Sequence, residues 1–400
     1  MGSAKTKQQS GALADATFLA LGFRPFYLLA GVFAAVAVPI WLMSFTGGMR
    51  MDGYLPGIAW HSHEMIFGFA PAIMAGFLLT AVRNWTGQPT PTGMSLAALV
   101  VLWLVARILM LTGPATAAAL IDSLFLPALG VAIAIPIWRS RNKRNYKILA
   151  VLTALTLANV CFHLASLGVL PVGASRVAIF AALDVIAILV AIIGGRVIPA
   201  FIGNAIEKSA PRHVFSIEVI SVGALVVILA FDSLQWWAPV PNAVWLAILA
   251  IAAVVHGIRL LLWQPFLTHG NPLLWMLPVA YAWLPIMLAL RALSLLSVVP
   301  ISAAFHALTV GAIASLMIAI MMRSALGHTG RELEAGPFEI SAFLLLQLAA
   351  IVRVLASTVV PGAYREAMIV SGVLWTSAFV VFLIRYWPIL TRARIDGRQG

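Results

Sequence analysis

The sequence predicts an all-α membrane protein, a polytopic helical bundle of about twelve transmembrane spans with both termini in the cytoplasm. Composition is the first observation: 62% of the 400 residues are hydrophobic and only 10% are charged, whereas soluble domains carry about 25% charged residues. The mean hydropathy is +1.02. The second observation is that apolar windows of roughly 20 residues recur along the chain, the length that crosses about 30 Å of hydrocarbon. No run alternates as the strands of a porin-like barrel do.

The apolar windows predict the individual spans in order. They lie near residues 25–45, 61–82, 94–112, 117–138, 146–168, 176–199, 213–234, 240–262, 273–294, 300–323, 338–359 and 366–390. The intervening loops are too short for a soluble domain, so we expect a single transmembrane domain over residues 18–391. Polar residues 1–17 are expected to be a disordered cytoplasmic tail, and residues 392–400 a basic cytoplasmic tail. No cleavable signal is evident, because the first apolar run is long enough to span.

The net charge of +12 reflects the orientation of the chain in the membrane. The predicted cytoplasmic segments carry most of the loop and tail basic residues, namely Lys5, Lys7, Arg139, Arg141, Lys143, Arg144, Lys147, Lys208, Arg212, Arg331, Arg392, Arg394 and Arg398. The opposite loops offer mainly Arg50, Arg176 and Arg365. This asymmetry follows the positive-inside rule and orients the chain. We therefore expect the lipid bilayer as a partner and no nucleic acid.

The chain contains one cysteine, Cys161. A single thiol excludes an internal disulfide, a Cys-rich zinc site, an iron–sulfur cluster and covalent C-x-x-C-H haem attachment. Any haem must be held non-covalently. Cys161 itself is interpreted as a small buried core residue.

Histidines supply the candidate ligands, because imidazole commonly binds haem iron, copper and zinc. Ionisable groups in a membrane usually mark a functional site. The predicted metal ligands are His61, His63, His163 and His306 near the outer membrane face, and His256 in the inner half of the eighth span. The alternatives are interfacial solvation for the first pair, hydrogen bonding to Asn159 for His163, and a local partnership with Arg259 for His256.

The run Trp60–Phe69 begins the second span and contains His61, His63 and Glu64. Residues two apart on a helix point about 200° apart. Both histidines can therefore ligate one metal only if His61 precedes the helix. Otherwise one faces the cofactor while the other, or Glu64, supplies a supporting contact or a proton path. Glu64 and His61 are the candidate catalytic residues.

An internal match relates the second and tenth spans. Aligning residues 63–87 with 306–330 without gaps matches His63 with His306, and it also matches Gly68 with Gly311, Met74 with Met317 and Thr86-Gly87 with Thr329-Gly330. Related spans would present one histidine each at equal depth. We therefore predict that His63 and His306 are the two axial ligands of one haem b.

A second polar set lies near the predicted inner face. It comprises Arg196, Asn204, Arg323, His328 and Arg331. Arginine pairs with carboxylates in bidentate fashion, so these residues are candidates for binding haem propionates. The alternative is that the arginines reach towards lipid headgroups. Near the outer helix ends, Arg107, Arg291 and Arg353 are expected to form structural ion pairs, some of them with Asp122 or Asp184.

Several motifs together resemble the NnrS family. They are Gly22-Phe23-Arg24-Pro25-Phe26, Trp60-His61-Ser62-His63-Glu64-Met65, Arg144-Asn145-Tyr146-Lys147, Gly194-Gly195-Arg196-Val197-Ile198-Pro199 and Gly327-His328-Thr329-Gly330-Arg331. The likeness runs from about residue 20 to 390. It implies a haem- and copper-containing protein of the bacterial inner membrane, expressed with denitrification functions and linked to nitrosative stress. Its motif positions are His61, His63, Glu64, Arg196, Asn204, His306, His328 and Arg331.

The resulting hypothesis is a membrane haem b protein, with copper as a possible second metal, that binds nitric oxide. It would reduce or detoxify nitric oxide, as an oxidoreductase, at a His-ligated site near the outer face. No quinone or nucleotide signature identifies the electron donor. Two alternatives stay open: a transporter or metal permease whose histidines bind an ion, and a non-enzymatic sensor or haem chaperone.

Overall fold

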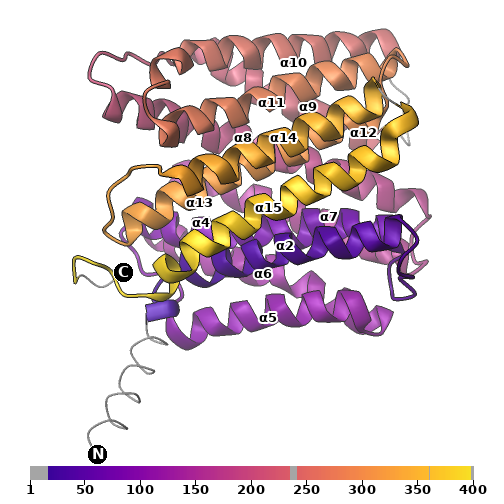
Figure 1. Ribbon diagram of the computed structural model, residues 1–400, viewed down its shortest axis with the longest axis horizontal. Coiled ribbons are helices and arrows are strands. Elements are labelled where there is room, and N and C mark those ends of the chain that lie inside the picture. Colours follow the sequence, from indigo (N-terminus) through magenta and orange to yellow (C-terminus); the bar gives the residue numbers. More distant parts are fainter. Residues whose placement is uncertain (1–16, 235–240, 360, 398–400) are drawn as a thin grey trace, which may run out of the picture. The chain divides into compact units, whose positions relative to one another are not determined.

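The computed structural model describes residues 17–234, 241–359 and 361–397, and it contains no strand within those ranges (Figure 1). Twelve of its helical stretches are long and apolar enough to cross a membrane. The helices are α2 (Phe23–Phe45), α3 (Gly57–His63), η1 (Glu64–Phe69), α4 (Ala70–Thr86), α5 (Gly93–Thr112), α6 (Ala115–Arg139), η2 (Lys143–Asn145), α7 (Tyr146–Ser166), α8 (Gly173–Ala205), α9 (Phe215–Leu234), α10 (Asn242–Leu262), η3 (Pro265–Thr268), α11 (Pro272–Leu295), α12 (Ile301–His306), η4 (Ala307–Ala314), α13 (Ser315–His328), α14 (Pro337–Thr358), η5 (Pro361–Ala363) and α15 (Tyr364–Thr391). The all-α prediction is confirmed.

The predicted spans coincide with these helices to within a few residues. The largest difference is in the sixth span, because α8 continues from the predicted end near 199 to Ala205. A proline at position 199 does not end α8; prolines are tolerated in transmembrane helices, where neighbouring helices satisfy the backbone groups that they leave unpaired. Most of the predicted tail 1–17, and residues 398–400, lie outside the described residues.

Chain contacts divide the molecule into two compact units. Unit 1 comprises Met1–Leu170, Met321–Leu333 and Phe379–Gly400, and unit 2 comprises Pro171–Ile320 and Glu334–Ala378. In unit 1, α2 packs on α3, η1 and α4, while α6 packs against α4, α5 and α7. In unit 2, α8, α9, α10 and α11 are successive neighbours, and α11 also contacts α12 and η4. The single transmembrane domain over 18–391 stays a prediction.

The second and tenth spans share a backbone irregularity. In each, a short α-helix ends at a histidine, His63 or His306, and a π-helical segment begins at the next residue. An α-helix then continues, and in each span a glycine at or near its end, Gly87 or Gly330, adopts a left-handed conformation with φ of 65° or 75°. These shared features support the predicted internal repeat.

The interpretation of Cys161 as a buried residue is wrong, because its side chain is exposed. An exposed thiol in a transmembrane helix is explained by the lipid environment. A small, weakly polar side chain can face hydrocarbon at little cost. Apolar residues exposed along the same membrane spans, such as Leu157 at 61% exposure, face the same environment.

Candidate metal centre

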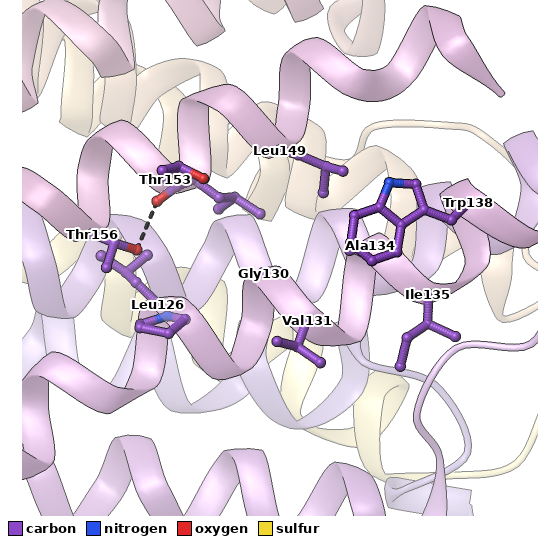
Figure 2. Close-up of a pocket in the computed structure, with 11 residues that line it drawn as sticks. Leu126, Gly130, Val131, Ala134, Ile135, Trp138, Leu149, Thr153 and Thr156 are labelled. Atoms are coloured by element: carbon purple, nitrogen blue, oxygen red, sulfur yellow. Dashed lines mark hydrogen bonds between the residues drawn. The ribbon is translucent and has the colours of Figure 1, made fainter. Parts of the chain in front are cut away.

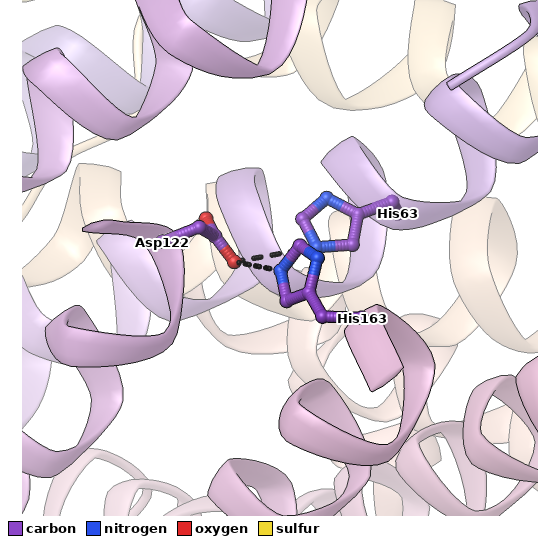
Figure 3. Close-up of side chains that lie close together, drawn as sticks. All are labelled: His63, Asp122 and His163. Carbon is purple, nitrogen blue, oxygen red and sulfur yellow. Dashed lines mark hydrogen bonds and ion pairs between the residues drawn. The ribbon is translucent and has the colours of Figure 1, made fainter. Parts of the chain in front are cut away.

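Three side chains of unit 1 that could bind a metal ion converge in its interior. His63 ends α3, Asp122 lies in the second turn of α6 and His163 lies in the last turn of α7 (Figure 3). Because α6 and α7 follow each other in the chain and pack together, the start of α6 lies beside the end of α7. All three residues are buried, with 0%, 2% and 2% exposure. Among the described residues, these three form the one group whose ligand atoms all lie within 4.8 Å of one another.

The separations suit one metal ion. Asp122 Oδ2 lies 3.0 Å from His163 Nε2 and 3.3 Å from His63 Nε2. Metal–nitrogen and metal–oxygen bonds are about 2.0–2.2 Å in tetrahedral sites. That geometry places two ligand atoms about 3.3–3.5 Å apart. Small changes in the distances between the three ligand atoms would therefore accommodate an ion among them.

Hydrogen-bond acceptors face both ring nitrogens of His63. Its Nδ1 lies 3.0 Å from Glu64 Oε1, and an ionised carboxylate only accepts, so Nδ1 carries a hydrogen. Its Nε2 faces two more acceptors, Asn159 Oδ1 at 3.1 Å and Asp122 Oδ2 at 3.3 Å. A neutral imidazole would turn a lone pair towards these oxygens. A second proton on His63, a proton on Asp122, or a metal ion between these atoms would satisfy Nε2.

Hydrogen bonds from neighbouring side chains orient each candidate ligand. Glu64 holds the His63 ring, and Asn159 donates from Nδ2 to Asp122 Oδ2 at 2.8 Å. The Tyr54 hydroxyl lies 3.1 Å from His163 Nδ1, and burial raises the pKa of Tyr54, so the phenol stays protonated at neutral pH. Metal-binding histidines usually have such a partner on the second ring nitrogen, where it fixes the tautomer. The three candidate ligands thus have the kind of hydrogen-bond partners that metal ligands usually have.

Arg107 links the two carboxylates of the cluster. Its guanidinium contacts both Glu64 and Asp122, and it is 6% exposed. The side chain packs over Gly68 in η1, where a Cβ would meet Arg107 Nη1 at 2.6 Å. One guanidinium against two carboxylates leaves this buried set with a formal charge of −1 when both imidazoles are neutral. A bound cation would offset that charge.

The structure separates His61 from this cluster. Both His61 and His63 belong to helix α3, so the helical twist directs them to different sides, as predicted. The His61 ring stacks on Trp41 with a centroid separation of 4.2 Å. His61 is therefore not among the three converging ligands, and its catalytic role stays a prediction.

His256 lies in a different setting, in unit 2. Its Nδ1 is 2.8 Å from the Tyr281 hydroxyl and its Nε2 is 3.1 Å from the Ser221 carbonyl oxygen. Arg259 donates to the same Tyr281 hydroxyl at 2.9 Å. Both ring nitrogens therefore have hydrogen-bond partners, which favours the alternative of a local network with Arg259. Metal ligation by His256 stays a prediction.

His306 also belongs to unit 2, whereas His63 belongs to unit 1. Its Nδ1 lies 2.7 Å from the Ser302 carbonyl oxygen, so Nδ1 carries the hydrogen and Nε2 is the basic nitrogen. This tautomer suits an axial haem ligand. The sharing of one haem by His63 and His306 stays a prediction.

The predicted inner-face residues are also divided between the units. Arg196 and the exposed Asn204 belong to unit 2, and Arg323, His328 and Arg331 belong to unit 1. The pKa of Arg331 is lowered by burial and by the nearby cations Arg385 and Arg392. The His328 ring lies 5.5 Å from that of Phe23. Binding of a propionate by these residues stays a prediction.

Two of the predicted structural ion pairs are confirmed. Arg107 pairs with Asp122, and Arg291 donates to Asp184 at 2.9 Å while also pairing with Asp232. The third arginine, Arg353, lies 3.3 Å from the Tyr364 hydroxyl.

Asp122, a candidate ligand, and Tyr54, a supporting contact, are not among the site residues that the sequence predicts. The aspartate was interpreted only as the partner of an arginine. A signal was present, because Asp122 and Asp184 are carboxylates inside apolar runs, where ionisable groups usually mark sites. The alternative that Asn159 hydrogen-bonds His163 is wrong, because the Asn159 amide bonds His63 and Asp122.

Comparison with known proteins identifies one family. Residues 17–394 match the family described as NnrS protein. A comparison with curated proteins finds no match. The matched region includes the ligand cluster, both π-helical segments and all twelve membrane-spanning helices. The motifs that resembled NnrS sequences thus lie within a match over nearly the whole chain, and the protein belongs to the NnrS family.

Proposed function

We propose that this multi-pass membrane protein is a metalloprotein that binds nitric oxide, with one metal ion held by His63, Asp122 and His163. The observation that carries the proposal is the His63 Nε2 atom, whose two neighbours at 3.1 and 3.3 Å are acceptor oxygens. A metal ion bound to His63, His163 and Asp122 satisfies all three ligand atoms at once. It also offsets the negative charge of the buried set.

Copper suits both the donors and the chemistry, as does iron(II), which two histidines and one carboxylate also bind. Imidazole binds zinc, copper, iron and nickel, and copper(II) has the highest affinity in the divalent series. Copper also changes oxidation state, which zinc does not. The NnrS resemblance implies copper as well. The choice of copper therefore rests on family membership, and the donor set is compatible with it.

A haem b is proposed as the second cofactor, with His306 as an axial ligand. The Nδ1 bond to Ser302 leaves the basic electron pair on Nε2, the nitrogen that an axial ligand uses. His63 cannot serve both metals through the same Nε2 atom. The predicted His63–His306 pairing and the proposed copper centre are therefore competing assignments for His63, and the His63→Ala variant separates them.

The proposed reaction is the reduction of nitric oxide to nitrous oxide. Two molecules of nitric oxide, two electrons and two protons give one nitrous oxide and one water. Copper would supply the site where nitric oxide gains electrons; the electron donor is a separate redox protein or small reductant. Nitric oxide is small and uncharged, so it reaches a buried site through the bilayer.

Residues of unit 1 would supply the protons for this reaction. Glu64 hydrogen-bonds His63 through Oε1, and its Oε2 is buried without a hydrogen-bond partner among the described residues. This carboxylate oxygen can accept a proton and pass it towards the centre, while Arg107 stabilises the charged form of Glu64. Packing of Phe162 and Phe67 against the His63 ring excludes bulk water.

Spectra and metal analysis of purified protein test the proposal. Wild type should contain copper, show a haem Soret band and change its spectrum on addition of nitric oxide. His163→Ala should lose copper and keep the haem, and His306→Ala should do the opposite. His269→Ala, at an exposed loop histidine, is the matched control. Loss of haem with retention of copper in His63→Ala would assign His63 to the haem. Protein lacking both metals would favour a transporter, and binding of nitric oxide without turnover would indicate a sensor.

A further inference from the structure

A lipid-facing groove runs between α6 and α7 in unit 1 (Figure 2). Its volume is about 390 Å³, within the range of about 300–1,000 Å³ typical of ligand sites. The lining residues are Leu126, Pro127, Gly130, Val131, Ala134, Ile135, Trp138, Leu149, Leu152, Thr153 and Thr156. Several of these lining side chains are exposed and apolar, such as Val131 at 61% exposure and Trp138 at 63%. Both helices are long and apolar enough to span a membrane, so the groove opens towards acyl chains.

A glycine keeps the groove open. A Cβ at Gly130 would meet no atom within 4 Å, so the space beside it is empty of protein. The polar atoms in the lining are chiefly the Thr153 and Thr156 hydroxyls. Thr156 donates to the Leu152 carbonyl oxygen at 2.8 Å. The groove therefore contains no titratable lining residue, and it suits an alkyl chain rather than a quinol headgroup that must release protons.

One end of the groove meets a basic loop. Trp138 lies at that end, directly before the end of α6 at Arg139, and α7 begins at Tyr146. The segment 139–147 has five exposed basic side chains, Arg139, Arg141, Lys143, Arg144 and Lys147, and no acidic residue. Asn142 anchors the loop by donating from Nδ2 to the Trp85 carbonyl oxygen at 3.1 Å. Positive charge is thus held at the level where a lipid headgroup lies.

We propose that this groove and basic loop bind one anionic phospholipid, with an acyl chain along Gly130 and the phosphate at Arg139–Lys147. Basic pockets beside transmembrane helices are suited to anionic headgroups, and each Lys or Arg near the surface contributes about fivefold in affinity. Trp138 suits the boundary between chain and headgroup, where tryptophan is enriched. The site is separate from the metal centre and does not depend on the proposed function.

Two variants of the full chain test the two halves of the site. Gly130→Leu fills the groove; it replaces a helical glycine by a good helix former, so the helix should be preserved. Arg139→Gln/Arg141→Gln/Lys143→Gln removes three charges. The matched controls are Gly223→Leu, at another helical glycine with open space in α9, and Lys208→Gln/Arg212→Gln, at another exposed basic loop.

The readout is native mass spectrometry of the protein from mixed micelles containing dioleoyl phosphatidylglycerol or dioleoyl phosphatidylcholine. Wild type should retain one phosphatidylglycerol in preference to phosphatidylcholine. Gly130→Leu should lose that lipid, and the triple variant should lose the preference by about tenfold or more, while both controls behave as wild type. Equal retention of both lipids by wild type, or wild-type retention by Gly130→Leu, would overturn the proposal. Displacement of phosphatidylglycerol by added ubiquinone at equal concentration would also overturn it, in favour of a quinone site.

Discussion

His63 and His306 occupy the same position in two transmembrane spans, each as the last α-helical residue before a π-helical segment. A π-helical segment shifts the register of side chains relative to an ordinary α-helix, and such segments are frequent at functional sites. The segment η1 contains Glu64 and Gly68 and lies against Arg107. These three residues support the proposed metal centre. The segment η4 directly follows the proposed haem ligand.

Replacing Gly68 by alanine should weaken the metal centre. The new Cβ would meet Arg107 Nη1 at 2.6 Å and Glu64 Oε2 at 3.2 Å, so the Arg107 guanidinium would have to shift relative to its two carboxylates. We expect a loss of about 1–3 kcal/mol in stability, as for other overpacked interiors, together with reduced copper content. Thermal unfolding in detergent and metal analysis provide the measurements.

Gly223→Ala is the control for Gly68→Ala, since nothing lies within 4 Å of a Cβ at Gly223. It should be neutral or stabilising by up to about 1 kcal/mol. If both alanine variants behaved alike, the packing of Arg107 over Gly68 would have no energetic role.

Removing the charge of Arg107 should destabilise the protein strongly. Arg107→Gln removes the guanidinium that pairs with both Glu64 and Asp122, and breaking a buried ion pair costs about 3–5 kcal/mol. The exposed Arg50 provides the comparison, because Arg50→Gln should change stability by less than about 0.5 kcal/mol. A loss below about 1 kcal/mol for Arg107→Gln would indicate that Glu64 is neutral in the wild-type protein.

Arg196 and Arg323 are predicted to bind an anionic group of the cofactor. If they do, Arg196→Leu or Arg323→Leu should lower the haem content of the purified protein by several-fold while the unfolding temperature changes little. Haem is measured by its pyridine haemochrome spectrum. Unchanged haem content with normal folding would assign these arginines to lipid headgroups.

The orientation of the chain is predicted from its basic loops. A reporter that is active only in the periplasm should be inactive when fused after Arg144 and active when fused after Arg50. The opposite pattern would place the metal centre, at the His63 end of the second span, towards the cytoplasm.

The sequence predicted the helices well because the bilayer imposes a length and a hydropathy on each span. It predicted that His61 and His63 diverge, because helical periodicity fixes that relationship. It did not predict the meeting of His63 with Asp122 and His163, since these residues lie on three helices far apart in sequence. Nor did it predict the π-helical segments, because no residue type specifies them.

The most direct test of the central claim is the copper EPR spectrum of the oxidised, purified protein. If His63, Asp122 and His163 hold copper, wild type should show nitrogen hyperfine splitting from two imidazoles. His163→Ala should lose most of the signal or retain splitting from a single imidazole, while His269→Ala should match wild type. A two-imidazole copper spectrum that survives unchanged in both His63→Ala and His163→Ala would contradict the account.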